Sequence, residues 1–381
     1  MEKLEKIPFN VPFQVGKEGS YIQQAMKLGV LSGNGNFTKK AQGILEKCYA
    51  FEKVLLTTSC TDALEMAAIL MEIEPGDEVI LPSYTFVSTA NAFVLRGAKI
   101  RYVDSRPDHP GMDESAISAL INENTKVIVP VHYAGVACDM DMIKAQIDGL
   151  KIRIVEDAAQ AIDSKYKDEY LGSIGEVGCF SFHETKNISS GEGGALLVNE
   201  ANLRARAEIL WEKGTNRAAF WRGEIDKYSW VDVGSSYLPS ELNAAYLTAQ
   251  LEDLRNIQNA RLNLWNKYHE AFAALETKGV NRRPIIPEYA SNNAHMYYLI
   301  LNSLQERSEL IEYLKKREIY AVFHYIPLHL STFGQKYSSE PLPNAEFYSD
   351  HLLRLPLYAG LSSQNQYRVI EAINSFFGDR T

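Results

Sequence analysis

Short apolar runs alternate with helical patterns through the first half of the chain, and this alternation restricts the fold more than any other feature. The runs that read as β-strands are Val54–Leu56, Val79–Leu81, Ile100–Val103, Val127–Pro130 and Ile152–Glu156. The helical patterns between them cover Ala63–Met71, Thr85–Leu95, Glu114–Ile121 and Met140–Ile147. Parallel strands need such crossover helices. We therefore expect an α/β fold with a mostly parallel central sheet and helices on both faces.

The second half of the chain changes character. Cys179–Phe182 and Ala195–Asn199 are too close for a crossover helix, so a local change of sheet direction is expected there. A long helical pattern over Glu241–Glu276 predicts a helix that links two domains. Beyond it, a small α+β domain is predicted from strands and helices at Met296–Leu301, Ser308–Arg317, Ala321–Tyr325 and Gln364–Phe377. We expect domains over residues 1–238 and 239–381.

Composition excludes several classes of protein. The 381 residues are 46% hydrophobic and 23% charged, which is an ordinary composition for a globular protein. A chain of this length is too long to fold around a single core. A net charge of -9 argues against a nucleic-acid partner. The four cysteines form no CxxC pair, so neither a disulfide framework nor a structural zinc site is expected. The first residues lack a signal-peptide core and no stretch resembles a membrane span, which predicts a cytoplasmic protein with no membrane partner.

Hydroxyl-bearing residues stand between the first strand and the helix after it. Ser59, Cys60 and Thr61 occupy this position, where the free N–H groups of a helix N-terminus can bind phosphate. The alternative is that Ser59 or Thr61 only caps the helix. Neither a P-loop nor a GxGxxG sequence is present, which disfavours a nucleotide-binding Rossmann enzyme.

Two further residues lie at strand ends. Asp157 ends a buried strand, where a carboxylate faces the ligand crevice of an α/β protein or caps the next helix. Lys186 follows another apolar strand and precedes the turn Ser190–Gly194. A single lysine in a loop is usually only exposed to solvent. Here it is the third polar site at a strand end, after the hydroxyl-bearing segment and Asp157, and this series indicates a catalytic site. Together they supply an amine, an anion and a phosphate cup, as pyridoxal 5′-phosphate (PLP) requires.

With these motifs, the chain resembles the DegT/DnrJ/EryC1/StrS family of sugar aminotransferases from Ile7–Asn10 to Leu355–Tyr358. The resemblance implies PLP as cofactor, the PLP-dependent transferase fold type I and a small C-terminal domain. It implies that Lys186 bonds the aldehyde of PLP and that Asp157 pairs with its ring nitrogen. By the same resemblance, further cofactor contacts come from Ser59, Cys60, Thr61 and Ser181 on the phosphate, Gln160 on the phenolic oxygen and Phe86 on the ring.

One departure concerns contacts between subunits. Many members have an asparagine that reaches the cofactor phosphate of the neighbouring subunit, and Ser236 occupies that place here. A serine hydroxyl is shorter and can require a bridging water. A homodimer with active sites at the subunit interface remains what the resemblance implies.

Other polar residues are candidates for substrate contacts. His324 and His329 would face opposite sides of a strand, so shared metal ligation is not expected. With Tyr325, they are candidates for contacting the nucleotide sugar, a structural role being the alternative. Arg217 and Arg222 are candidates for holding its phosphates. His183 stands three residues before Lys186; some relatives replace the lysine by histidine and are dehydratases, so the lysine favours transamination.

Three segments narrow the expected reaction: Pro82–Asn91, Pro130–Cys138 and the run around Lys186. They resemble members that use L-glutamate to convert dTDP-4-keto-6-deoxyglucose to dTDP-4-amino-4,6-dideoxygalactose for enterobacterial common antigen. Formation of the gluco C4 epimer, amination at C3 and PLP-dependent dehydration of the sugar remain alternatives. A non-enzymatic PLP-binding regulator is disfavoured, because no further binding module is found.

Overall fold

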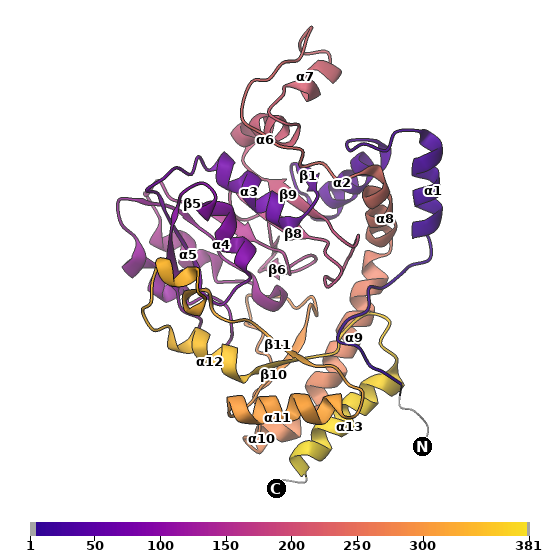
Figure 1. Ribbon diagram of the computed structural model, residues 1–381, viewed down its shortest axis with the longest axis vertical. Coiled ribbons are helices and arrows are strands. Elements are labelled where there is room, and N and C mark those ends of the chain that lie inside the picture. Colours follow the sequence, from indigo (N-terminus) through magenta and orange to yellow (C-terminus); the bar gives the residue numbers. More distant parts are fainter. Residues whose placement is uncertain (1–4, 379–381) are drawn as a thin grey trace.

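A seven-stranded sheet forms the centre of the computed structural model, which describes residues 5–378 (Figure 1). Its order is β1-β9-β8-β5-β4-β2-β3, and only β9 runs antiparallel to its neighbours. The strands are β1 (Val54–Thr57), β2 (Glu78–Pro82), β3 (Lys99–Val103), β4 (Thr125–Ile128), β5 (Arg153–Asp157), β8 (Val177–Ser181) and β9 (Gly194–Val198). The predicted parallel sheet and its local reversal are confirmed.

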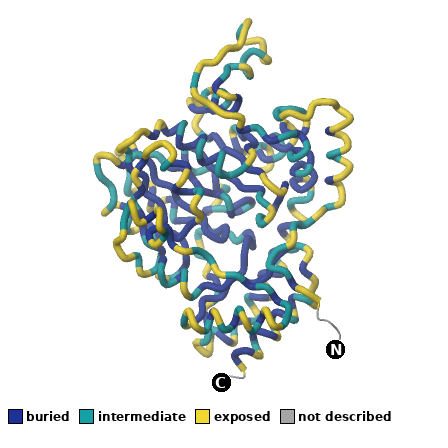
Figure 2. The backbone as a smooth tube through the Cα atoms, in the orientation of Figure 1, coloured by how far each residue is buried: buried dark blue, intermediate teal, exposed yellow. Residues whose placement is uncertain are grey.

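Helices cover both faces of the sheet, so its strands are buried (Figure 2). Leu55 of β1 joins one hydrophobic core, whereas Val54 and Leu56 join the other, as the alternation of side chains along a strand requires. The first core contains α3 (Cys60–Leu70), α4 (Val87–Val94) and α6 (Arg204–Trp211). The second contains α1 (Glu18–Leu28), α2 (Asn36–Tyr49), α5 (Met140–Gln146) and α8 (Glu241–Glu252). None of the helices within residues 5–378 is long and apolar enough to span a membrane.

Two predicted helices differ from those observed. The segment after β3 is the 3-10 helix η1 (Glu114–Leu120). The long pattern beginning at Glu241 is divided into α8, α9 (Leu254–Ala271) and α10 (Ala273–Thr277). Asp253 separates the first two with φ -109° and ψ 11°, outside the helical range. Hydrophobic periodicity continues across such a local break, which explains why the sequence predicted one helix.

A three-stranded antiparallel sheet forms the smaller domain. Its order is β10 (Tyr297–Ile300), β12 (Leu352–Leu355) and β11 (Val322–Phe323). Its helices are α11 (Leu304–Lys315), α12 (Pro343–His351) and α13 (Ser363–Gly378). The remaining elements of the chain are α7 (Arg217–Trp221), β6 (Lys165–Tyr166), β7 (Glu169–Tyr170), η2 (Tyr133–Gly135), η3 (Ala201–Leu203), η4 (Leu328–Leu330) and η5 (Gly334–Lys336).

Hydrophobic packing divides the chain differently from the expected boundary at residue 238. Helix α8 packs on α1 and α2 beside the large sheet, whereas most of α9 packs in the small domain. Ile7 also lies in the small-domain core and its amide donates to Glu318 O. The packing boundary therefore falls near the start of α9, and the N-terminal segment joins the later domain. Residues 1–4 and 379–381 of the expected domains lie outside the described residues.

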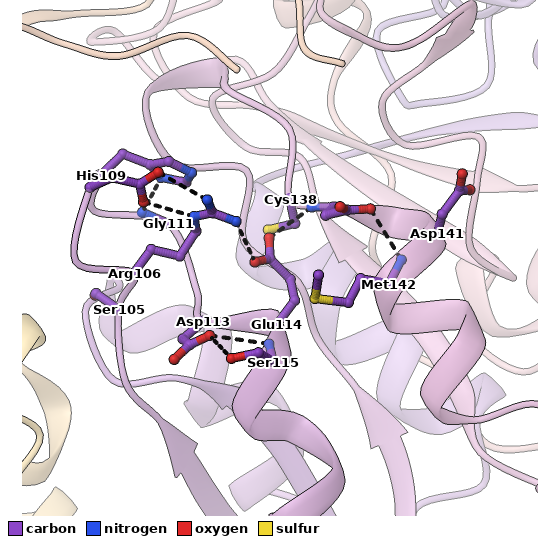
Figure 3. Close-up of polar contacts among 12 residues, drawn as sticks. Ser105, Arg106, His109, Gly111, Asp113, Glu114, Ser115, Cys138, Asp141 and Met142 are labelled. Atoms are coloured by element: carbon purple, nitrogen blue, oxygen red, sulfur yellow. Dashed lines mark hydrogen bonds and ion pairs between the residues drawn. The ribbon is translucent and has the colours of Figure 1, made fainter. Parts of the chain in front are cut away.

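The loop after β3 ties the two domains together. Asp104 accepts hydrogen bonds from the amides of Asn344 and Ala345, 3.1 and 2.8 Å away, at the start of α12. Arg106 pairs with Asp108 and Glu114, which fixes the conformation of the loop (Figure 3). These contacts hold the small domain against the edge where the parallel strands of the large sheet end.

A buried glutamate fixes the end of the central strand. Glu156 of β5 accepts hydrogen bonds from the backbone amides of Gly172, Ile174 and Gly175 at 2.6 to 2.8 Å. His132 Nε2 donates to it at 3.0 Å, because His132 Nδ1 already accepts from a backbone amide. Burial alone would raise the pKa of Glu156, but these hydrogen bonds outweigh burial and lower it.

We expect Glu156→Gln to reduce the free energy of unfolding at pH 7 by about 3 kcal/mol, because an amide cannot accept all four hydrogen bonds. A lowered pKa means that the glutamate stabilises the fold above its usual pKa and loses this effect as the pH falls through the folded-state pKa. The difference between the proteins should therefore shrink below about pH 4.5. Urea unfolding across pH tests this, with the exposed Glu123→Gln as control. Equal stability of wild type and Glu156→Gln at pH 7 would contradict the assignment.

Candidate active site

A cavity of about 460 Å³ lies where the carboxyl ends of the parallel strands meet the small domain. It brings together most of the residues singled out in the sequence. Those that line it are Ser59, Cys60, Thr61, Phe86, Asp157, Gln160, Ser181, Lys186, His324 and Tyr325. Ligands of α/β proteins bind at this edge of the sheet, so the cavity is the candidate active site.

Asp157 is held in a fixed orientation at the end of β5. Asp157 is only 5% exposed and lines the cavity, so a ligand in the cavity could bond the carboxylate. Thr89 Oγ1 donates to Asp157 Oδ2 at 2.7 Å, and the amide of Ala159 donates to Oδ1 at 3.1 Å. A carboxylate stabilised in this way can accept a further charge-assisted hydrogen bond from a cationic ring nitrogen.

The N-terminus of α3 forms another wall. Ser59 is its N-cap and accepts from the amide of Asp62 at 3.1 Å, so the capping interpretation is correct. The cap also lines the cavity with Cys60 and Thr61, whose amides belong to the first helical turn. Gly194 of β9 runs beside this turn, and a Cβ there would lie 2.4 Å from the nitrogen of Cys60. The absence of a side chain at Gly194 keeps this helix N-terminus open, as an anion-binding helix end requires.

Lys186 enters the cavity from the loop between β8 and β9. Its neighbour Asn187 anchors this loop, donating to Gln258 Oε1 of α9 and to Asn293 O at 2.8 Å. His295 Nδ1 bonds Asn187 Oδ1 at 2.9 Å. Burial lowers the pKa of the Lys186 amine from that of an ordinary lysine. A larger fraction of the amine is therefore unprotonated and nucleophilic near neutral pH.

Aromatic and polar groups from both domains close the opposite side. Gln160 Oε1 accepts from the amide of Ala134 at 2.7 Å, and its Nε2 donates to the Tyr325 hydroxyl at 3.3 Å. The rings of His324 and Tyr325 are stacked with centroids 3.6 Å apart. Phe86 is 56% exposed and faces the cavity, which leaves its ring free to contact a ligand. These positions agree with the expected ones, but the individual roles remain predictions.

His329 does not reach the cavity. Strand β11 ends at Phe323, so the expectation that His324 and His329 share a strand is wrong. His329 lies in η4, where its Nδ1 bonds Ser83 Oγ at 2.7 Å and its Nε2 bonds Glu346 at 3.2 Å. This buried side chain links the two domains in the structure.

Ser236, Arg217 and Arg222 line a different cavity of about 760 Å³ near α7. Arg222 is already paired with Glu208 and Glu224, both at 2.7 Å. Within one chain these residues do not join the candidate active site. The contact of Ser236 with the cofactor phosphate of a neighbouring subunit remains a prediction. The expectation that Arg217 and Arg222 hold the phosphates of the nucleotide sugar also remains a prediction.

Among the cavity-lining residues that sequence reasoning missed, His295 and Arg354 come from the later part of the chain. His295 precedes β10, and Arg354 lies on β12 of the small domain. Neither stands in a motif with spacing that indicates chemistry. Only the packing of the small domain on the large one brings them to Lys186.

Comparison with known proteins agrees with this geometry. The model of the DegT/DnrJ/EryC1/StrS aminotransferase family matches residues 14–374, which is nearly the whole chain. The chain belongs to this family. It is thus a PLP-dependent sugar aminotransferase, and the expected fold class, enzyme class and cofactor are confirmed at the level of the family.

Individual relatives cover the chain from end to end. The spore coat polysaccharide biosynthesis protein SpsC of Bacillus subtilis is 32% identical over 384 residues, 96% of each protein. The PLP form of Spr1654 from Streptococcus pneumoniae superimposes with a TM-score of 0.90 at 26% identity, covering 98% of each chain. The aminotransferase TlmJ from Streptoalloteichus hindustanus has the same score and identity, covering 99% of this chain and 100% of TlmJ.

The residues present fit the PLP of this aminotransferase family. Lys186 offers an amine of lowered pKa, and Asp157 offers an oriented carboxylate. The open first turn of α3, where Gly194 leaves room, offers amides and hydroxyls for a phosphate. All three lie on the same cavity, which matches the three kinds of group on PLP.

The lowered pKa of Lys186 makes a prediction for the PLP-free enzyme. At pH 7.5 with limiting formaldehyde and a borohydride reagent, Lys186 should be methylated before the exposed lysines, because only the neutral amine reacts. Peptide mass spectrometry measures the order, with exposed Lys278 as the internal control. Labelling of Lys186 no faster than Lys278 would count against the low pKa.

Proposed function

We propose that this aminotransferase transfers the amino group of L-glutamate to C4 of dTDP-4-keto-6-deoxyglucose, giving dTDP-4-amino-4,6-dideoxygalactose. The observation that carries amino transfer is the convergence of Lys186, Asp157 and the first turn of α3 on one cavity. Resemblance of the segments Pro82–Asn91 and Pro130–Cys138 to such enzymes supports the substrate. The similarity to SpsC supports a product used in a surface polysaccharide. Because nucleotide sugars are made in the cytoplasm, we propose that location.

Lys186 and Asp157 divide the chemical work. When bound, PLP withdraws electrons from the carbon that carries the donor's amine, so that the proton on this carbon can be removed. Asp157, held by Thr89, keeps a proton on the ring nitrogen and so maintains this electron withdrawal. The Lys186 amine, once released from the cofactor, acts as the base that takes the proton from the α-carbon of glutamate.

Transfer to the sugar runs in the opposite direction. Lys186 returns a proton to C4 of the sugar, and the face from which it does so sets the configuration of the product. Burial keeps the pKa of Lys186 low enough for it to alternate between base and acid near neutral pH. Contacts to the diphosphate, remote from the reacting carbon, supply binding energy that orients the ketone.

We further propose that two copies of the chain associate through the segment around α7. This segment projects from the large domain, as Figures 1 and 2 show. Its Trp221 and Trp230 are 67% and 80% exposed, which is costly for aromatic rings unless a partner covers them. In such a dimer, Ser236 and Arg217 would be available to the cofactor phosphate and the nucleotide of the other subunit.

The alternatives differ in product. Amination that yields the gluco epimer, or amination at C3, would use the same residues with the sugar in another orientation. A dehydratase would remove a hydroxyl from the sugar without consuming glutamate. The presence of Lys186 favours transamination over dehydration.

Product analysis tests the proposal. Incubation with L-glutamate and dTDP-4-keto-6-deoxyglucose should form 2-oxoglutarate and an amino sugar in equal amounts, and NMR should show the galacto configuration at C4. Lys186→Ala should lack both turnover and the yellow absorbance of the bound cofactor while remaining folded. A product that has lost a hydroxyl, with glutamate unchanged, would instead establish a dehydratase.

Asp157→Asn tests the role of the carboxylate. We expect kcat/KM to fall by about 100-fold or more, because a neutral amide does not stabilise the protonated ring. The cofactor should stay bound through Lys186, with its absorbance shifted. Asp113→Asn, at the start of η1, serves as a control for the same chemical change outside the cavity. Near-normal kinetics of Asp157→Asn would refute the assignment.

A further inference from the structure

His295 is a buried histidine of the cavity wall that no step of the proposed mechanism uses. It is 5% exposed and precedes β10 of the small domain. Its backbone is fixed, because its amide donates to Asn293 Oδ1 at 3.0 Å and its carbonyl oxygen accepts from Arg261 at 2.7 Å. The imidazole ring is therefore held at one place beside the cavity, where its two nitrogen atoms have different surroundings.

Asn187 determines which ring nitrogen of His295 carries the proton. The Nδ2 atom of Asn187 faces Gln258 Oε1 and the carbonyl oxygen of Asn293, both at 2.8 Å. A carbonyl oxygen can only accept, so this nitrogen is the donor and Oδ1 of Asn187 is an acceptor. His295 Nδ1 lies 2.9 Å from that Oδ1 and therefore donates to it. In the neutral imidazole, the other nitrogen, Nε2, is then an acceptor.

The surroundings of His295 keep its ring neutral. Burial lowers the pKa of His295 well below its ordinary value, and the positive charges of Lys186, Arg261 and Arg354 lower it further. Within residues 5–378, no carboxylate forms an ion pair with His295 and no hydrogen bond reaches its Nε2. The ring thus offers a free lone pair on the wall of the cavity.

Lys186 is the donor that fits this lone pair. It adjoins Asn187, so the reactive amine and the anchor of the His295 ring belong to the same loop. Both side chains line the same cavity. Among the charged groups that lower the pKa of His295, Lys186 has the largest effect, which places its amine close to the ring.

The other groups around Lys186 do not supply an equivalent acceptor when PLP is bound. Burial raises the pKa of the Cys60 thiol well above its usual value, so the sulfur stays protonated and accepts only weakly. Arg354 can only donate. The carboxylate of Asp157 is engaged by the ring nitrogen of the cofactor in the proposed mechanism. An ammonium formed at Lys186 would otherwise be buried without an acceptor, which is costly.

We propose that His295 is a positioning residue that accepts a hydrogen bond from the Lys186 ammonium after Lys186 has taken the α-proton of glutamate. This inference rests on the proposed function, in which the free amine of Lys186 is the base. The proton moves from the α-carbon to Lys186 Nζ and stays there until it is passed on, so His295 contributes a lone pair and is not itself protonated. Because the contact forms with the charged lysine, it speeds proton transfer more than it strengthens substrate binding.

Two substitutions separate the two nitrogen atoms of the ring. An asparagine amide falls near Nδ1 of a histidine and a glutamine amide near Nε2, so His295→Asn keeps the bond to Asn187 and His295→Gln keeps an acceptor for Lys186. His295→Asn should lower kcat by about tenfold or more in both half-reactions, because a hydrogen bond to a charged group is lost. The KM values for glutamate and the keto sugar should change less than about threefold. His295→Gln should recover part of the lost rate.

Two outcomes of these kinetics overturn the inference. A purely structural role predicts the opposite order, with His295→Asn active and His295→Gln impaired. A contact between His295 and one substrate predicts a raised KM in one half-reaction alone. Circular dichroism of both variants verifies folding.

The pKa of Lys186 gives a readout independent of turnover. In the pyridoxamine form of the enzyme the lysine is free, and labelling with trace acetic anhydride followed by peptide mass spectrometry compares it with the exposed Lys278. An acceptor stabilises the ammonium, so its removal lowers the pKa of Lys186. At pH 7, Lys186 of His295→Asn should be labelled about tenfold faster than that of wild type, which corresponds to a decrease of about one in the pKa. Equal labelling would overturn the inference.

A matched control uses another buried histidine. His109 is 4% exposed, its Nδ1 accepts from the amide of Gly111, and it does not line the cavity. His109→Asn makes the same chemical change away from Lys186 and should leave both the labelling of Lys186 and kcat at wild-type values.

Wild-type protein alone tests the protonation of the ring, so the result does not depend on the folding of a variant. His295 is the only histidine followed by a methionine, and labelling of that pair assigns its signals. Nitrogen NMR should show a neutral ring with its proton on Nδ1 at about pH 7. A proton on Nε2 overturns the inference. Failure of wild type to aminate the sugar would refute the proposed substrate, whereas the labelling and NMR would still test His295.

Discussion

The buried carboxylate of Glu156 fixes the end of β5, and the active site depends on that strand end. Glu156 and Asp157 are consecutive, so their side chains leave the strand on opposite faces. The first is saturated by His132 and three backbone amides, whereas the second keeps acceptor capacity for a ligand. The sheet thus places two adjacent carboxylates in different surroundings, so that Glu156 is used in the structure and Asp157 is available for the proposed chemical role.

The site is also a junction between domains. The large domain contributes Lys186, Asp157 and the first turn of α3, and the small domain contributes His324, Tyr325 and Arg354. Hydrogen bonds from a backbone amide of α12 to Asp104 and from Asn187 to Gln258 hold the two domains in their relative positions. A cavity built in this way can combine a rigid cofactor platform with a wall that selects substrates.

Local patterns predicted much of this architecture. Alternating strands and helices indicated the parallel sheet, and the short connection to β9 indicated its reversal, since both follow from connection lengths. Periodicity did not reveal the break at Asp253, because an apolar face continues across it. His329 was misplaced for a related reason: β11 is shorter than its apolar run, and the following segment turns away to bond Ser83.

The sequence by itself identified three residues that lie at or after strand ends, namely Ser59, Asp157 and Lys186. In a parallel sheet, the carboxyl ends of the strands meet at one edge, so their order along the chain was enough to group them. Only the tertiary structure decided that Arg354 and His295 join them and that His329 does not. Those positions depend on how the small domain packs across the strand ends. Such long-range packing leaves no spacing pattern in the sequence.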